Sequence, residues 1–318
     1  MRIAVLDDYQ DVALKYADWS VLPSDTKIQV FRDHLFDEDA IVERLKDFEI
    51  VMSMRERTPF PRSLLERLPN LKLLTTTAML NRAIDVESGM ELGITVCGTG
   101  SVPSPTVDLT WGLILALLRY IPQEDRAIRD GKWQTSMGIG LQDKTLGVVG
   151  LGNLGSKVAV VGKAFGMNVI AWSQNLTAER TAQFGVTLVT KDELFSQSDI
   201  VTVHMVLSDR SRGLVGASDL AKMKPTSYLI NTSRGPIVDE KALVEALGNG
   251  AIAGAGLDVF DQEPLPPDHP LRHLENVVVT PHIGYVTTET YEVFFRDTVE
   301  NIQAFLEGRP IRVITTSR

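Results

Sequence analysis

The feature that most constrains this chain is a glycine-rich turn in the sequence TLGVVGLGNLG at residues 145–155. Its apolar opening is typical of a short buried strand, and three glycines complete the pattern G-x-G-x-x-G: Gly150, Gly152 and Gly155. Residues 156–165 carry apolar side chains at helical spacing, and Gly166 follows where a helix would end. A lone glycine pattern also occurs in ordinary turns. A strand, a glycine turn and a helix in this order instead predict a site for the phosphates of a dinucleotide.

Composition limits the class of protein. The 318 residues favour about two domains, and 44% hydrophobic with 23% charged residues is typical of a folded globular chain. The formal net charge of −9 argues against nonspecific nucleic-acid binding, which depends on Lys and Arg neutralising phosphates. The longest apolar stretch, 109–118, is shorter than a membrane span, and the N-terminus resembles no signal peptide. A single cysteine, Cys97, fits a reducing compartment. We therefore expect a cytoplasmic protein that binds neither nucleic acid nor membrane.

The order of the predicted elements indicates two α/β domains. In the first hundred residues strands alternate with helices, which is typical of a small parallel sheet. These strands are predicted at 3–6, 28–31, 50–54, 71–75 and 94–97. The turn-forming sequence GTGSVPSP at 98–105 marks a boundary, and a mostly apolar helix begins at Pro105 with Ser104 as its N-cap. About six more parallel strands between 145 and 280 match a doubly wound dinucleotide-binding domain. A last helix at 287–306 could cross back to the first domain.

Polar residues follow three predicted strands of the second domain: Arg234, Glu263 and His282. Because ligands of open parallel sheets bind beyond the carboxyl ends of the strands, we expect these side chains to converge on one cleft. Arg234 can bind a carboxylate with two hydrogen bonds, and His282 can exchange a proton with a substrate oxygen near neutral pH. Glu263, hydrogen-bonded to His282, would favour the protonated imidazole and fix its ring. The set suits hydride transfer between a nicotinamide cofactor and a carbonyl carbon.

Each of these residues also has an ordinary explanation. Arg234 could be an ion-pairing surface residue, Glu263 a loop carboxylate among prolines, and His282 a loop histidine. The remaining histidines lack such partners in the sequence: His34, His204, His269 and His273. Of these, His204 is expected at a strand end near the cofactor. No metal site is predicted.

Four motifs in the second half occur in a known order and spacing. They are GLGNLG at 150–155, NTSRGPIVD at 231–239, GLDVF at 256–260 followed by Glu263-Pro264, and PHIG at 281–284. Together they resemble the D-2-hydroxyacid dehydrogenase family, which includes formate, glycerate and phosphoglycerate dehydrogenases and glyoxylate/hydroxypyruvate reductases. The resemblance extends through nearly the whole chain. It implies that the family's catalytic arginine, glutamate and histidine correspond to Arg234, Glu263 and His282.

The resemblance also implies an architecture of two α/β domains. A doubly wound, parallel-sheet Rossmann domain that binds the dinucleotide would span residues 102–285. A smaller flavodoxin-like substrate domain would span 1–101 and be completed by 286–318. Members are usually homodimers. The same matching places further residues beside an NAD(P) cofactor: Thr106, Asn153, Leu154, Thr232, Asp258 and Gly284.

The resemblance is weaker at the substrate. Family members often carry a glycine-containing loop after the fourth strand of the first domain, whose backbone amides bind the substrate carboxylate. The corresponding stretch here is TTAMLN at 76–81, with Ala78 where glycine is common and Met79 next to it. Arg55 could reach the cleft from the first domain, although an exposed arginine is an equal alternative. We therefore expect a small 2-oxo acid or D-2-hydroxy acid whose side chain the sequence does not define.

Cofactor choice depends on the end of the second strand of the nucleotide unit. Enzymes that use NAD place Asp or Glu there, about twenty residues after the glycines, to bind the ribose hydroxyls. This strand instead ends in Ser173, Gln174 and Asn175, so no acid repels a 2′-phosphate and no arginine at this position attracts one. We expect NADP(H) to be accepted at least comparably to NAD(H).

A different class of function competes with this prediction. The family has corepressor-like relatives, so the chain could be a catalytically weak protein that senses dinucleotides on the same fold. A sensor needs no proton donor, and the presence of Arg234, Glu263 and His282 therefore favours the enzyme.

Overall fold

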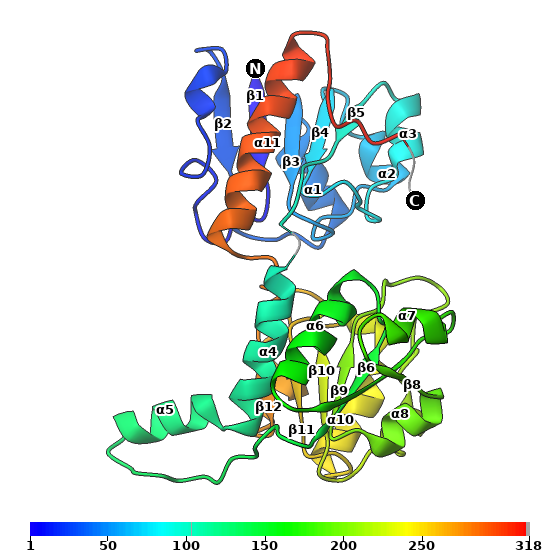
Figure 1. The fold of residues 1–318 in the computed structure, drawn as a ribbon. Helices are drawn as coiled ribbons and strands as arrows, with labels where there is room; N and C mark the ends of the chain where they lie inside the picture. Colours follow the sequence, from blue (N-terminus) through cyan, green and yellow to red (C-terminus); the bar gives the residue numbers. More distant parts are fainter. Residues whose placement is uncertain (103, 316–318) are drawn as a thin grey trace. The chain divides into compact units, whose positions relative to one another are not determined.

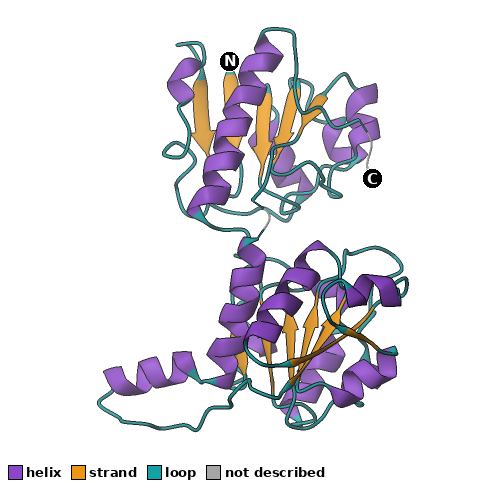
Figure 2. Ribbon diagram, viewed as in Figure 1, coloured by secondary structure: helices purple, strands orange, loops and turns teal. Residues whose placement is uncertain are grey.

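The structure is a computed structural model that describes residues 1–102 and 104–315. Pro103 of the predicted boundary turn and residues 316–318 of the predicted C-terminal segment lie outside the described residues. The chain divides into two compact units, each described here by itself (Figure 1). Unit 1 comprises Met1–Pro103 with Val286–Arg318, and unit 2 comprises Ser104–Tyr285. Both are α/β units in which helices pack on the faces of a parallel sheet (Figure 2).

Unit 1 contains a five-stranded parallel sheet in the order β2-β1-β3-β4-β5. The strands are β1 (Arg2–Val5), β2 (Lys27–Val30), β3 (Ile50–Ser53), β4 (Leu73–Thr76) and β5 (Thr95–Cys97). The helices are η1 (Trp19–Val21), α1 (Glu38–Leu45), α2 (Arg62–Leu65), α3 (Val86–Glu91) and α11 (Thr288–Leu306). This strand order is the flavodoxin-like order of doubly wound sheets.

The last helix of the chain, α11, belongs to unit 1 because specific hydrogen bonds attach it to the loop after β5. The Asp297 carboxylate accepts a hydrogen bond from the Gly100 N–H at 2.8 Å, and the Asn301 side chain donates one to the Gly98 carbonyl at 2.8 Å. The buried face of α11 includes Phe294, Phe295 and Ile302, and the helix packs on β4. Residues almost 200 positions apart in the sequence therefore share one core.

Unit 2 contains a seven-stranded parallel sheet in the order β12-β11-β10-β9-β6-β7-β8. The strands are β6 (Thr145–Val149), β7 (Asn168–Trp172), β8 (Thr187–Leu188), β9 (Ile200–Val203), β10 (Tyr228–Asn231), β11 (Gly254–Leu257) and β12 (Val277–Val279). The helices are α4 (Pro105–Leu118), α5 (Ile121–Arg129), α6 (Asn153–Ala164), α7 (Ala178–Ala182), α8 (Lys191–Gln197), α9 (Ala217–Leu220), η2 (Gly235–Ile237), α10 (Glu240–Gly248) and η3 (Pro270–Arg272). The strand order reverses between β9 and β6, which is where doubly wound sheets bind ligands.

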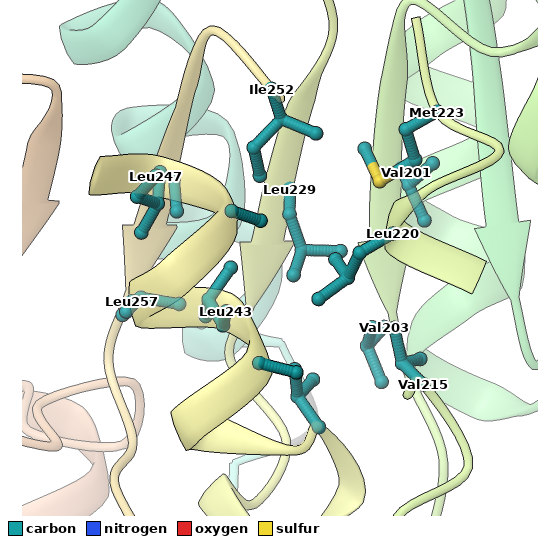
Figure 3. Packing of buried hydrophobic residues seen from close by; sticks show 14 of the residues in the cluster. Val201, Val203, Val215, Leu220, Met223, Leu229, Leu243, Leu247, Ile252 and Leu257 are labelled. Carbon is teal, nitrogen blue, oxygen red and sulfur yellow. The ribbon is translucent and has the colours of Figure 1, made fainter. Parts of the chain in front are cut away.

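Each face of this sheet has its own hydrophobic core. On one face, α4 and α6 pack against β6 and β10 through residues such as Trp111, Ile114 and Val158. On the other, Leu243 and Leu247 of α10 pack against the strands together with α9 (Figure 3). Because both faces are covered, the central strands are buried along their whole length, as expected for a parallel sheet.

The structure confirms the predicted α/β class and differs from the predictions in detail. Two helices, α5 and α7, and the short strand β8 were not predicted. Ser104 does occupy the N-cap of α4, but its side chain makes no capping bond and instead accepts one from Lys157 at 2.9 Å. No helix within residues 1–102 and 104–315 has both the length and the hydropathy required to cross a membrane.

Candidate active site

The glycine turn joins β6 to α6 in a conformation that only glycine allows. Gly150 has φ of +97°, and a Cβ at this position would lie 2.5 Å from the His204 carbonyl oxygen. A Cβ on Gly155 would lie 2.0 Å from the Gly150 carbonyl oxygen, so glycine lets the first turn of α6 pack against the turn. Gly152 is the N-cap of α6 and has open space around its Cβ position. The first N–H groups of α6 have no intrahelical partner and can bind a phosphate.

A pocket of about 460 Å³ lies beside this turn, at the point where the strand order reverses. Its volume is in the range of small-molecule sites. Six of the residues predicted to bind the cofactor line it: Gly150, Gly152, Ser173, Gln174, Asn175 and His204. A phosphate-binding helix end and a pocket at the carboxyl ends of β6, β7 and β9 fit a dinucleotide.

His204 follows β9 and is held in its neutral form. Burial lowers the pKa of this imidazole to about 4, so the ring carries no charge at neutral pH. The Nε2 atom lies 2.9 Å from Thr202 Oγ1. The Nδ1 atom is buried and has no hydrogen-bond partner among the described residues, and a ligand in the adjoining pocket could supply one.

The three predicted catalytic residues follow three neighbouring strands of the same sheet. Arg234 follows β10, Glu263 follows β11 and His282 follows β12. Parallel strands end at the same edge of a sheet, so the three loops start side by side.

Glu263 and His282 are in direct contact. The Glu263 Oε2 atom lies 2.5 Å from His282 Nδ1, and both side chains are largely buried. The other carboxylate oxygen, Oε1, accepts a hydrogen bond from the Phe260 N–H at 3.0 Å, which fixes the carboxylate. The edge of the His282 ring also packs against Tyr285, with ring centroids 5.7 Å apart. A ring held in this way through Nδ1 directs Nε2 away from the glutamate.

The loop that carries Arg234 contacts the loop that carries Glu263 through backbone atoms. A Cβ on Gly235 would lie 2.1 Å from the Phe260 carbonyl, so only glycine permits this approach. The Asn231 side chain donates a hydrogen bond to the Arg234 carbonyl at 3.0 Å, and the Arg234 guanidinium donates one to the Ser233 carbonyl at 2.7 Å. The close approach of Gly235 to Phe260, together with the bond from the Phe260 N–H to the Glu263 carboxylate, therefore connects the two loops.

A buried carboxylate, Asp258, holds the segment that follows His282. One oxygen accepts hydrogen bonds from the Thr280 hydroxyl at 2.6 Å and the Ile283 N–H at 2.8 Å, and the other accepts one from the Gly284 N–H at 2.8 Å. Burial raises the pKa of the Asp258 carboxyl above its ordinary value, against these hydrogen bonds and the neighbouring His282. His282 itself has φ of +53°, an uncommon conformation for a residue other than glycine. The Asp258 bonds therefore fix residues on both sides of it.

The start of α4 is joined to the same region. The Thr106 hydroxyl donates a hydrogen bond to the Gly284 carbonyl at 2.9 Å. The Thr110 hydroxyl bonds the Thr106 carbonyl and lies 2.8 Å from the Thr232 hydroxyl. Predicted cofactor residues from α4 and from the ends of β10 and β12 therefore form one hydrogen-bonded cluster.

Comparison with known proteins identifies the family. Residues 111–284 match the family model "D-isomer specific 2-hydroxyacid dehydrogenase, NAD binding domain". A glyoxylate reductase from Aeropyrum pernix is 41% identical over 256 residues, which cover 77% of this chain and 76% of that protein. A hydroxypyruvate reductase from Blautia hydrogenotrophica is 32% identical over an alignment of 330 positions, which covers 99% of each chain.

The chain belongs to the D-isomer-specific 2-hydroxyacid dehydrogenase family. The crystal structure of a phosphoglycerate oxidoreductase from Vibrio cholerae O395 agrees, with a TM-score of 0.91 and 36% identity over 97% of this chain and 99% of that one. The predicted family, its Rossmann fold and its reaction class, the nicotinamide-linked oxidation and reduction of 2-hydroxy acids, are therefore confirmed.

Three of the residues predicted to bind the substrate lie in unit 1, near the carboxyl ends of β3 and β4, whereas Arg234 belongs to unit 2. Arg55 and Ala78 both have positive φ, of 54° and 68°. The Ala78 N–H donates to the Thr99 hydroxyl at 2.8 Å, so in this structure it is already bonded. The Met79 N–H makes no hydrogen bond within the described part of the chain, and its side chain is exposed. Of the two backbone amides, the Met79 N–H is therefore the one that could donate a hydrogen bond to a substrate carboxylate.

Two of the remaining histidines have acidic partners in the structure that the local sequence did not indicate. His34 does have a charged partner, because its Nδ1 lies 2.9 Å from the buried Asp7 carboxylate. His269 lies 3.1 Å from Glu240. Both partners lie more than 25 residues away in the sequence, which is why local sequence patterns gave no sign of them.

The structure also brings two arginines that were not predicted to the pocket beside the glycine turn. They are Arg180 of α7 and Arg210 in the loop after β9. The only sign of Arg210 in the sequence was the basic stretch SDRSR at 208–212. A second pocket, of about 760 Å³, lies between α4, α5 and the loop after α5. None of the predicted site residues lines it.

Proposed function

We propose that this protein reduces small 2-oxo acids to D-2-hydroxy acids and catalyses the reverse reaction, with Arg234, Glu263 and His282 as its catalytic set. The observation that carries the assignment is the 2.5 Å hydrogen bond between Glu263 and His282 Nδ1 at the carboxyl edge of a dinucleotide-binding sheet. In a histidine held through Nδ1, Nε2 is the nitrogen that faces away from the carboxylate, and imidazole nitrogens can exchange protons with a substrate oxygen.

A bound nicotinamide cofactor supplies the hydride during reduction and accepts it during oxidation. The protein then has two tasks, to hold the acid and to move a proton. The planar, cationic guanidinium of Arg234 can bind the substrate carboxylate with two parallel hydrogen bonds. It thereby orients the neighbouring carbonyl, and the Arg55 guanidinium and Met79 N–H of unit 1 are proposed to bind the same substrate.

His282 is the proposed acid in reduction and base in oxidation. The proton on Nε2 passes to the carbonyl oxygen as that oxygen gains negative charge. Glu263, bonded at Nδ1, stabilises the positive imidazolium before the transfer and keeps the ring in position afterwards. Asp258 positions the histidine by fixing the backbone on both sides of it.

For the substrate we propose an acid with a small side chain, of the size of glyoxylate or hydroxypyruvate. The related proteins that carry those names support this choice. For the cofactor we propose that NADP(H) is accepted at least comparably to NAD(H), because the residues after β7 are uncharged.

We also propose a homodimer in a reducing, cytoplasmic environment. The helix α5 and the loop after it extend away from the rest of unit 2 (Figure 1). They expose several large apolar side chains. The exposed fractions are 52% for Ile121, 54% for Ile128, 75% for Trp133 and 91% for Met137. A second copy of the chain would remove this surface from water. The buried, unpaired Cys97 fits a reducing compartment.

Absorbance of NADH and NADPH, followed with glyoxylate, hydroxypyruvate and bulkier 2-oxo acids, tests the proposal. We expect oxidation of both cofactors with the small acids and slower turnover as the side chain grows. Tight binding of a dinucleotide without turnover of any acid would favour the sensing protein instead.

A further inference from the structure

We propose that Arg210 and Arg180 form a binding site for the 2′-phosphate of NADP(H) in the pocket beside the glycine turn. The inference rests on the proposed function, because a dinucleotide must first occupy this pocket. It goes further because it attributes a preference for NADP(H) to residues outside both the glycine motif and the end of β7.

The position of the pocket is the first argument. In a doubly wound sheet the pyrophosphate lies at the start of the helix after the first strand, and the adenosine ribose lies at the end of the second strand. The pocket contains both places, since Gly150 and Gly152 line it together with Ser173, Gln174 and Asn175 after β7. A group attached to the ribose 2′-oxygen would therefore lie among the residues after β7 and the side chains facing them.

The charge of the pocket is the second argument. The whole chain has a formal net charge of −9, yet the residues that line this pocket include two arginines and no Asp or Glu. Within residues 1–102 and 104–315, neither Arg180 nor Arg210 forms an ion pair with a carboxylate. Most other arginines in the described part of this acidic protein form an ion pair with a carboxylate, for example Arg129 with Asp125.

The contacts of each arginine are the third argument. The Arg210 guanidinium donates a hydrogen bond to Gln174 Oε1 at 2.6 Å, which holds it over the end of β7 although it comes from the loop after β9. The Arg180 guanidinium packs on the Phe184 ring at 4.6 Å and donates to Gln183 at 3.0 Å. Both cations therefore bond only neutral amide oxygens. A phosphate dianion is a stronger acceptor and can bind the remaining N–H groups of both.

Isothermal calorimetry with NADPH and NADH as separate ligands tests the site without relying on catalysis. The wild-type protein should bind NADPH more tightly than NADH. Arg210→Gln should weaken NADPH binding by about 10- to 100-fold, because charge-assisted hydrogen bonds to the phosphate are lost. Binding of NADH, which has no 2′-phosphate, should change by less than about threefold. Arg180→Gln should act in the same direction.

Two further measurements sharpen the result. Arg210→Glu should make NADH the tighter ligand, because a carboxylate repels the phosphate and can accept hydrogen bonds from the ribose hydroxyls. Added salt should weaken NADPH binding more steeply than NADH binding in the wild type, since exposed charges are screened. The matched control is Arg309→Gln, which removes an exposed arginine of unit 1 that does not line the pocket. It should leave both affinities unchanged.

The inference is overturned if Arg210→Gln and Arg180→Gln leave the ratio of NADPH to NADH affinity unchanged. It is also overturned if both affinities fall together. A wild-type protein that binds neither dinucleotide would contradict the proposed function itself, and that outcome is distinct because it appears before any variant is compared.

Discussion

At the scale of single residues, the proposed chemistry depends on a histidine, His282, whose orientation other residues determine. Glu263 fixes Nδ1 of His282, and the Asp258 carboxylate fixes the backbone around it. The positive φ of His282 costs conformational energy that these bonds must offset. These contacts hold the ring in one orientation, as the proposed proton transfer requires.

Replacing this histidine should separate catalysis from cofactor binding. His282→Ala removes the proton donor and is expected to lower kcat by about 10²- to 10⁴-fold. The dissociation constant of the cofactor, measured by calorimetry, should change little. His273→Ala, at an exposed loop histidine, is the matched control and should retain wild-type kcat. A large loss of cofactor affinity in His282→Ala would place this residue in the cofactor site instead.

Arg234 is expected to act on the substrate. Arg234→Gln keeps a hydrogen-bonding side chain but removes the charge, so substrate binding should weaken by about 2–5 kcal/mol. Steady-state kinetics with a small 2-oxo acid should show the loss in kcat/KM. Arg234→Lys should recover part of it, because a point charge replaces the two-pronged guanidinium. Activity of Arg234→Gln within about threefold of wild type would count against the role.

At the scale of elements, the ends of strands determine where polar groups lie and how they titrate. His204 at the end of β9 is the clearest case, because the sheet buries its ring beside Thr202. Its folded pKa, about 4, lies below the ordinary histidine value of about 6.5. At pH values between about 4 and 6.5, His204 is protonated in the unfolded chain but stays neutral in the folded chain. Stability should therefore fall as the pH falls from about 6.5 toward 4.

Urea unfolding of wild type and His204→Gln at two pH values tests this linkage. Relative to the variant, the wild type should lose about 2 kcal/mol of unfolding free energy between pH 7.5 and pH 5. The glutamine does not titrate, so the comparison removes contributions from all other groups. An identical pH dependence in both proteins would show that His204 is not held neutral by burial.

Elements were predictable from the sequence where apolar residues are concentrated. Most strands of both sheets and the buried helix α4 consist largely of apolar residues. The helix α5 does not, because its sequence is mostly polar and two of its few apolar residues, Ile121 and Ile128, face solvent. The strand β8 has only two residues, too few for any pattern.

Candidate site residues were predictable from the sequence when they come shortly after a predicted strand. Arg234, Glu263 and His282 could be placed at one sheet edge from strand order alone. Arg210 could not, because its loop has no periodicity and its partner Gln174 is 36 residues away. The pairing of His34 with Asp7 depends in the same way on the fold of unit 1.

At the scale of the whole molecule, we expect two chains to associate through α5 and the loop after it. Replacing Ile128 and Met137 by Glu would place charges in the apolar interface and should give a monomer at micromolar concentration. Size-exclusion chromatography with light scattering measures the mass directly. Val160→Glu, at an exposed valine of α6, is the control and should leave the dimer intact. A wild-type protein that is monomeric at all concentrations would refute the proposal.

The most direct test of the proposed hydride transfer from the nicotinamide to a 2-oxo acid follows a labelled hydrogen atom. The wild-type protein is incubated with a small 2-oxo acid and NADPH or NADH that carries deuterium on the transferring face of nicotinamide C4. The product is then analysed by NMR and chiral chromatography. We expect a D-2-hydroxy acid with deuterium on its second carbon. An unlabelled product, or the L enantiomer, would contradict the proposal.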